Sequence, residues 1–435
     1  MRVASLGLLA LSTATAIEPV EKLVLSSSEV NLIEVAVGPS AVVPLYAAIY
    51  SGSSSDPAGR EGLAWVTAKL LARQAGAEIG VTVTREMTLF NIPAQTGLES
   101  KARALSRAML KPTFATEDIE QVRKEALAEV ESIRHDPARL AAEAFHVFVF
   151  RGHPYAHPSP GTSPGLEKIT LEDTLGFHAG HYRKGNFAIA VSAALREQVL
   201  AGIRSAFAAL PDGESSRESQ AITFLPRPRF LVVESQDAPP GGTILIGHPT
   251  HVTVAHPDYF SLQAALGGGV EQAGELLPSP LRQPAVILSP GSLADGSASS
   301  LAALLVRVRE IAAMGISADR LETIRGSMRS LAQGSAESSQ SPLVSRLEEF
   351  LHRSPGLAAR QSASLDQITG ESVRAAAARH LFAGRVALIA VVPSSDRFVA
   401  EILASLAMKE TGVTLFGSGP TRNDFEILRG ADLFR

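Results

Sequence analysis

The chain alternates between short apolar runs and longer stretches in which apolar residues recur every three or four positions. Residues 41–46 and 230–233 are such runs, rich in β-branched side chains, and each predicts a strand. The longer stretches have the spacing of amphipathic helices. Strands separated by long helical stretches predict an α/β (α+β) fold, in which each β-sheet is covered by helices.

The same order of signals occurs twice along the chain. A helix that opens with a threonine and acidic residues is followed in each half by a short apolar strand. Thr170 and Thr369 suit the N-cap position of these helices, because a threonine side chain accepts a hydrogen bond from the first turn. The two copies are 199 residues apart, which predicts an internal duplication. The helices are expected over 169–182 and 368–381, and the strands over 187–191 and 386–392.

A polar, Pro-rich segment divides the chain almost in half and reads as a linker. We therefore predict an N-terminal domain over 19–212, a linker over 213–229 and a C-terminal domain over 230–435. Residues 1–18 carry one positive charge, a short apolar stretch and an Ala-x-Ala ending, which is typical of a signal peptide or an N-terminal tail. If the signal is real, the protein is periplasmic or secreted; otherwise it is cytoplasmic.

Composition excludes several classes of function. The 435 residues are 45% hydrophobic and 19% charged, as in a folded globular protein, and the net charge of −4 argues against a nucleic-acid partner. The absence of cysteine excludes disulfides, thiolate metal sites and cysteine nucleophiles. No apolar run is long enough to cross a bilayer, so we expect no membrane span.

Residues 151–191 carry the most specific pattern in the chain. It contains Arg-Gly-His-Pro-Tyr at 151–155, Gly-Thr at 161–162 and His-Tyr-Arg-Lys-Gly-Asn at 181–186, which leads into the predicted strand. This pattern resembles the insulinase/pitrilysin family of zinc peptidases, in the branch that includes mitochondrial processing peptidase. The resemblance extends over nearly the whole chain. It implies two similar domains, each with a β-sheet covered by helices, that together form half of a clamshell.

The family's zinc motif, His-x-x-Glu-His, falls on the helix expected at 62–71 of this chain. Two histidines four residues apart on one helix face can share a zinc ion, and the glutamate between them activates a water. The three positions here hold Trp65, Ala68 and Lys69, and the first 134 residues contain no histidine. None of these side chains replaces a zinc ligand or the general base. We predict a buried Trp65 and a displaced or solvent-facing Lys69.

Glu129 matches the family's distal zinc-binding glutamate. A single carboxylate does not hold zinc, so a solvated helix face is the better interpretation of this residue. We therefore expect no metal and no cofactor in this chain.

In the second half the resemblance implies a glycine-rich segment, an arginine and a tyrosine that hold a peptide substrate. The peptide-binding candidates here are Gly267, Gly268, Gly269 and Arg282. No tyrosine follows Tyr259, so the tyrosine of the pair is missing. A simple turn and a rim arginine are the alternative interpretations.

Two histidine pairs have spacings that occur in metal sites. His153 and His157 are four residues apart, but Pro154 breaks any helix there, so their rings need not converge. His178 and His181 are three apart on a predicted helix, where packing or exposure is the simpler interpretation.

The sequence as a whole predicts a non-catalytic subunit of a heterodimeric zinc metallopeptidase, inactive alone. A partner chain of the same family would carry the zinc, and this chain would shape the chamber and bind the peptide. An alternative is a structural or peptide-binding protein without a catalytic partner, like the related core subunits of the mitochondrial respiratory complex. A third is a peptidase that uses an unrelated metal site such as His153 and His157.

Overall fold

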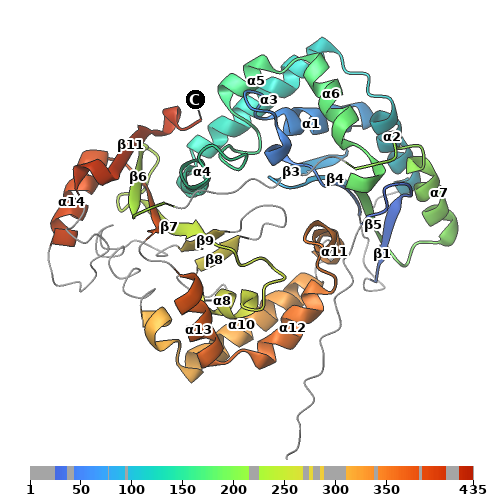
Figure 1. Ribbon diagram of the computed structural model, residues 1–435. Coiled ribbons are helices and arrows are strands. Elements are labelled where there is room, and N and C mark those ends of the chain that lie inside the picture. The colour runs from blue at the N-terminus through green and yellow to red at the C-terminus, as the bar shows by residue number, and fades with distance from the viewer. Residues whose placement is uncertain are drawn as a thin grey trace, which may run out of the picture.

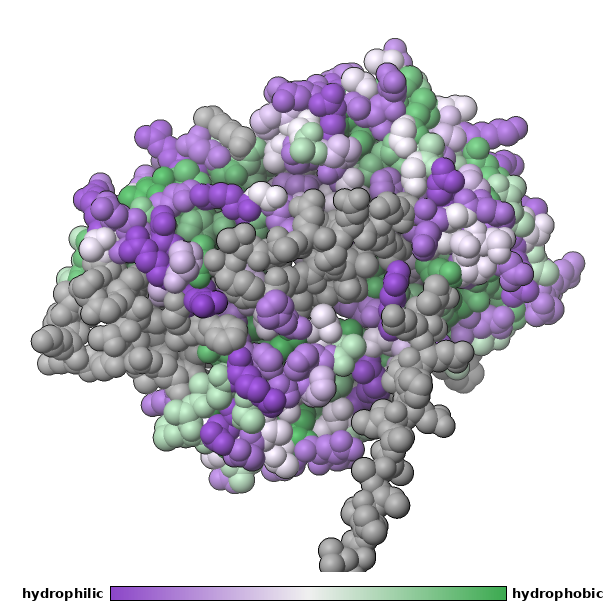
Figure 2. Space-filling model, viewed as in Figure 1, coloured by the Kyte–Doolittle hydropathy of each residue, from purple (hydrophilic) through white to green (hydrophobic). Residues whose placement is uncertain are grey.

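Two similar halves, each built on one β-sheet with helices on its outer side, make up the computed structural model (Figure 1). In the described part of the chain no helix combines the length and apolar character that a membrane crossing requires. Hydrophilic and hydrophobic residues are interspersed over the face shown in Figure 2. The structure describes residues 25–36, 44–76, 78–93, 97–214, 225–267, 274–277, 285–288, 310–337, 341–381, 385–407 and 421–434.

The first sheet has five strands, of which β1 and β5 run parallel while the other neighbours are antiparallel. Every residue of β2 and β5 is buried. These two strands are continuous apolar runs because helices cover both faces of the sheet at its centre. In spatial order the strands are β1 (Asn31–Val35), β5 (Phe187–Ser192), β2 (Leu45–Ile49), β4 (Thr88–Ile92) and β3 (Gly80–Val83).

The second sheet repeats this arrangement strand for strand and adds one strand at an edge. Its parallel pair, β6 and β10, corresponds to β1 and β5, and the antiparallel neighbours follow in the same order. The predicted internal duplication is therefore present in the topology. In spatial order the strands are β11 (Phe425–Arg429), β6 (Arg229–Glu234), β10 (Ala387–Val392), β7 (Thr243–Pro249), β9 (Ala285–Leu288) and β8 (Gly274–Leu277).

The helices follow the same repeat. Those of the first half are η1 (Ser53–Ser55), α1 (Leu63–Ala75), α2 (Leu98–Leu110), α3 (Thr116–Arg134), α4 (Pro137–Val149), α5 (Ser163–Lys168), α6 (Leu171–His181), η2 (Lys184–Asn186) and α7 (Glu197–Phe207). Those of the second half are α8 (Tyr259–Ala265), α10 (Ala318–Glu337), α11 (Ser341–Leu351), α12 (Leu357–Gln367), α13 (Gly370–His380), α14 (Ser395–Ala407), η5 (Arg422–Asp424) and η6 (Gly430–Asp432).

The predicted N-caps are confirmed at both copies. Thr170 precedes α6 and Thr369 precedes α13, and each threonine hydroxyl accepts the backbone N–H of the third helical residue. In both cases the side chain at that third position bonds back to the N–H of the cap. These reciprocal bonds satisfy N–H groups that the helix itself leaves unpaired.

One helix of each half packs against the sheet of the other half. Helix α4 packs against β6, β7 and β10 of the second sheet, and α11 packs against β1, β2 and β5 of the first. In Figure 1 these two helices lie between the halves, on the inner side of the sheets. Tyr50 at the end of β2 donates its hydroxyl proton to the carbonyl of Leu347 in α11 at 2.8 Å. The exchange joins the halves through two buried cores, because α4 and α11 each carry apolar residues into the opposite sheet.

The contact between α4 and β7 is close enough to require a glycine. A Cβ added to Gly247 would lie 2.3 Å from the carbonyl oxygen of Val286 and 2.5 Å from the ring of Phe145. Phe145 is completely buried. A side chain at position 247 would therefore push α4 off the second sheet.

The fold class predicted from the sequence is confirmed, as two similar domains with helix-covered sheets. The predicted domain limits stay predictions. Residues 1–24 and 215–224 lie outside the described residues, and these ranges contain the predicted signal segment and most of the predicted linker. The predicted strand at 41–46 is described only from residue 44, and β2 begins at Leu45.

Candidate functional site

Helix α1 is the element on which the zinc motif was expected, and its start is fixed by a buried carboxylate. Asp56 accepts the backbone N–H groups of Gly62 and Ala64, both at 2.7 Å. Gly62 has φ +106°, a left-handed conformation that favours glycine. Burial raises the pKa of Asp56 well above its usual value, although both N–H groups act in the opposite direction. The sequence thus retains the local structure that positions the helix.

The three zinc-motif positions are filled by packing contacts. Trp65 is 8% exposed, as predicted, and Ala68 is completely buried. Lys69 is half-buried, so part of its side chain faces solvent. Its ammonium lies 5.0 Å from the centre of the Trp65 ring, where the π-electrons attract a cation. A zinc ion does not fit this set, because an indole, a methyl group and an ammonium offer no lone pair to a dication.

Glu129 lies in α3 with its side chain 43% exposed. Its carboxylate accepts a hydrogen bond from Arg139 Nη2 at 2.5 Å. A carboxylate in this setting belongs to an ion pair on a solvated helix face. Its correspondence to the family's distal ligand stays a prediction.

The peptide-binding candidates of the second half fall largely beyond the described residues. Gly267, which follows α8, has φ +99°. Gly268, Gly269 and Arg282 lie outside the described residues. Their role in binding a peptide stays a prediction.

His153 and His157 have separate local roles. His153 Nδ1 accepts the backbone N–H of Tyr155 at 3.2 Å, and its ring packs edge-on against the Tyr155 ring. His157 Nδ1 lies 3.1 Å from the carbonyl oxygen of Pro158, and burial lowers the pKa of this ring. Among the described residues, neither belongs to a group of three side chains that could hold a metal.

His178 and His181 on α6 pack against different aromatic residues. His178 stacks on Tyr182 with ring centres 4.8 Å apart, and burial lowers the pKa of His178. His181 lies against Phe177, and its Nδ1 is 3.1 Å from Ser51 Oγ. These contacts agree with the packing interpretation.

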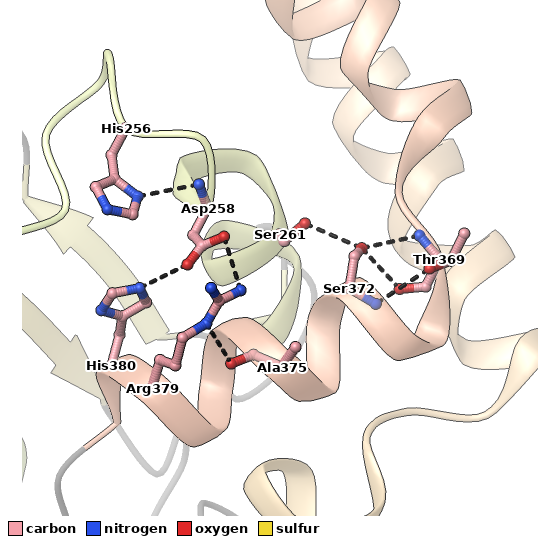
Figure 3. Close-up of polar contacts among 8 residues, drawn as sticks. All are labelled: His256, Asp258, Ser261, Thr369, Ser372, Ala375, Arg379 and His380. Atoms are coloured by element: carbon pink, nitrogen blue, oxygen red, sulfur yellow. Dashed lines mark hydrogen bonds and ion pairs between the residues drawn. The ribbon is translucent and has the colours of Figure 1, made fainter. Parts of the chain in front are cut away.

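A cluster that the sequence analysis did not assemble lies where α8 and α13 meet (Figure 3). His380, at the end of α13, places Nε2 2.7 Å from Asp258 Oδ2. Arg379 donates from Nη2 to Asp258 Oδ1 at 3.1 Å, and His256 Nδ1 accepts the backbone N–H of Asp258 at 3.0 Å. Burial lowers the pKa of His256; nearby Asp258 raises it, while His380 and Arg379 lower it. His380 lies 199 residues after His181, at the offset of the internal duplication. This repeat was the one feature of the sequence that could have drawn attention to His380.

The outer edge of the first sheet is a second feature with chemical capacity. Strand β3 ends the strand order and, in the described part of the chain, pairs only with β4. Its residues alternate between exposed Gly80 and Thr82 and half-buried Val81 and Val83. An edge of this kind presents unpaired backbone groups to which an extended peptide can add as a further strand.

Comparisons with known proteins agree with this fold. No family model matches the chain. Over 160 residues the chain is 26% identical to the beta subunit of mitochondrial-processing peptidase from Caenorhabditis elegans and to an uncharacterized zinc protease from Rickettsia bellii. The match covers 36% of this chain and only 35% and 39% of those two proteins.

Solved structures match over most of the chain. The M16 peptidase inactive domain from Pseudomonas fluorescens aligns with a TM-score of 0.71 at 21% identity, over 85% of this chain and 97% of that one. The first half of the periplasmic protease PqqL from Escherichia coli aligns with a TM-score of 0.69 at 15% identity, over 90% and 97%. A chain of complex III2 from Candida albicans aligns with a TM-score of 0.70 at 14% identity, over 88% and 100%.

The predicted resemblance is therefore confirmed: the chain has the fold of the insulinase/pitrilysin (M16) peptidases and is similar in sequence to relatives named as a processing-peptidase subunit and a zinc protease.

Proposed function

We propose that this chain is a non-catalytic subunit of a heterodimeric zinc metallopeptidase. The observation that carries the proposal is helix α1. The helix keeps its capping carboxylate and its buried packing face, while Trp65, Ala68 and Lys69 occupy the positions of the ligands and the general base. A scaffold retained without its chemistry is what a subunit needed for its shape and its interface would show.

The partner in this proposal is a zinc-bearing chain of the same family. The likeness to one half of the two-part protease PqqL supports this, because the chain matches 97% of that first half but 52% of the whole protein. A second chain would supply the other half of the clamshell. A periplasmic or secreted location, which depends on the N-terminal signal, remains part of the proposal.

The peptide would bind along β3. Helix α1 packs against this strand, so a peptide added at the β3 edge would pass the surface that bears the zinc in an active relative. Main-chain hydrogen bonds to the edge would hold the peptide in extended form. The exposed residues Gly80 and Thr82 are small and leave room beside the peptide. The glycine-rich segment and Arg282 would contact the peptide from the second half.

The alternative function is a structural or peptide-binding protein with no catalytic partner. The observation that favours this alternative is the alignment with a chain of complex III2, which covers 100% of that chain and 88% of this one. Under this alternative the chain has a stable partner, but no peptidase activity appears in any combination.

Co-expression with a zinc-bearing relative of the same source separates the two functions. The proposal predicts one zinc per heterodimer, and peptide cleavage that requires both chains. Alteration of the partner's zinc-motif glutamate should abolish cleavage and leave the complex intact. Cleavage by this chain alone would contradict the proposal, and a stable complex without cleavage would favour the alternative.

A matched pair of variants tests the β3 edge. Val81→Pro removes a backbone N–H that points away from β4, because Thr84 donates its N–H to Met87 and only every second residue of the strand bonds to β4. Val81→Ala keeps this N–H and loses similar packing. Cleavage by the complex should fall with the proline variant and persist with the alanine variant. Equal activity of both variants would exclude this edge as the peptide site.

A further inference from the structure

The cluster of His256, Asp258 and His380 has the composition of a metal site. Each residue offers one ligand atom, and these atoms all lie within 4.8 Å of one another. It is the one such group among the residues that the structure describes. It lies where α8 and α13 meet (Figure 3), whereas α1, the helix on which the family's zinc motif falls, belongs to the other half (Figure 1).

The fold holds these three side chains in place before any ion binds. The segment 256–258 leads into α8, whereas His380 ends α13, and α8 and α13 pack against each other in the core of the second half. The rings of His256 and His380 are 5.2 Å apart and nearly perpendicular, at 87°. Ligands held by two packed helices and the segment that leads into one of them lose little entropy when they close on a metal.

The surroundings suit an ion that arrives from solvent. The side chains of Asp258 and His380 are 14% and 16% exposed. They are therefore accessible but shielded from bulk water over most of their surface. Asp56 differs in its partners, because its carboxylate accepts two backbone N–H groups.

We propose that His256, Asp258 and His380 bind a first-row transition-metal dication, with Zn²⁺ as the reference ion. Two imidazoles and a carboxylate form a donor set that such ions prefer, and water completes the coordination. The ion takes the position between His380 Nε2 and Asp258 Oδ2, and the imidazole binds it as the neutral tautomer that carries its one proton on Nδ1. The site would tie the start of α8 to the end of α13. It is independent of the proposed peptidase partnership.

Two contacts beside the cluster determine how strongly each substitution should change the affinity for the metal. His256 Nδ1 accepts the Asp258 N–H, so a metal competes with this hydrogen bond, either for the lone pair or by requiring the other tautomer. His256 should therefore be the weakest of the three ligands. Arg379 bonds the same carboxylate and repels a cation, so its removal should strengthen binding.

The test uses the full chain, purified without a histidine tag, stripped with a chelator and titrated with ZnCl₂. We expect one zinc per chain, and a Co²⁺ derivative with visible d–d absorption. Loss of an outer-shell partner typically lowers metal affinity about 10–100-fold. Loss of the direct ligand His380 should lower zinc affinity by more than that. Arg379→Ala should tighten binding, and His256→Ala should weaken it less than His380→Ala.

Asp258→Asn is the variant that guards against misfolding, because an amide oxygen can still accept from His380 while the anionic ligand is lost. The matched control is His135→Ala. His135 contacts the two carboxylates of Asp237 and Glu131 but is exposed, and it belongs to no three-ligand group. Folded wild-type protein that takes up no zinc would overturn the proposal. So would zinc binding that survives both His380→Ala and Asp258→Asn.

Discussion

The α1–α6 corner of the first half and the α8–α13 corner of the second half occupy the same place in the duplicated fold, but their carboxylates have different partners. Asp56 is bound by two backbone N–H groups at the start of α1. Asp258 makes no such bond to α8 and instead pairs with His380 and Arg379. His181, which corresponds to His380, has Nδ1 3.1 Å from Ser51 Oγ and packs on Phe177.

This difference shows how a duplicated scaffold can separate structure from chemistry. In the first half Asp56 binds the backbone N–H groups at the start of the zinc-motif helix. In the second half Asp258 and His380 are partly accessible side chains, and their mutual contact could be replaced by contacts to a ligand. Under the proposed function, the half that the family resemblance marks as catalytic therefore has a structural role in this chain.

The largest effect should come from the helices that the halves exchange. Phe145→Ala removes a completely buried ring by which α4 contacts the second sheet, and should lower the free energy of unfolding by about 3–5 kcal/mol. Leu347→Ala in α11 is the counterpart on the first sheet, at about 2–5 kcal/mol. Urea unfolding measures both.

If the exchange joins the halves into one cooperative body, each variant should shift a single transition. The surface variant Arg103→Ala, on an exposed ion pair of α2, serves as the control and should change stability by less than about 1 kcal/mol. Two separated transitions in the wild type would show that the halves unfold independently.

The next effect concerns pH, since each exchanged helix carries or adjoins a histidine whose Nδ1 atom is buried. His146 lies in α4 and His352 follows α11, and in each ring Nδ1 has no hydrogen-bond partner in the described structure. Burial lowers the pKa of His352 to about 4, and burial together with Arg85 lowers the pKa of His146 well below 6.5. The folded state therefore favours both rings in the neutral form.

The direction of the pH effect follows from these lowered values. The unfolded chain takes up the proton near pH 6.5, so stability is fully present above that pH and is lost as pH falls toward 4. For His352 the loss is at most about 3 kcal/mol, at 1.36 kcal/mol for each pKa unit. His352→Gln should flatten the profile of unfolding free energy between pH 7 and 4. An unchanged profile in this variant would contradict the assignment.

The repeat, both helix caps and the burial of Trp65 could be predicted because they depend on local patterns. Thr170 and Thr369 each open a helix within three residues, which sequence shows directly. The helix exchange could not be predicted, since the amphipathic pattern of α4 does not say which sheet its apolar face meets. The pairing of Asp258 with His380 joins residues 122 positions apart, and only the packing of α8 on α13 brings them together.

A smaller effect tests the comparison between the two corners. Asp56→Ala leaves the buried N–H groups of Gly62 and Ala64 without their acceptor, and should cost about 2 kcal/mol. Asp258→Ala removes partly exposed side-chain contacts and should cost about 1 kcal/mol. Thermal and urea unfolding of both variants would give this order. The reverse order would mean that Asp258 is the structural residue of the two.

The smallest effect should come from Lys69, and it bears directly on the helix of the zinc motif. If Lys69 only packs on Trp65, Lys69→Met keeps the aliphatic stem and replaces the cation–π contact by a sulfur–aromatic one. The free energy of unfolding should then change by less than about 1 kcal/mol, and cleavage by the complex with a zinc-bearing partner should be unaffected. Trp65→Ala, which empties a buried site on the same helix face, should cost about 3–5 kcal/mol and provides the contrast. A loss of cleavage in Lys69→Met without a loss of stability would instead give this ammonium a role in the assembled enzyme, because packing alone cannot account for that separation.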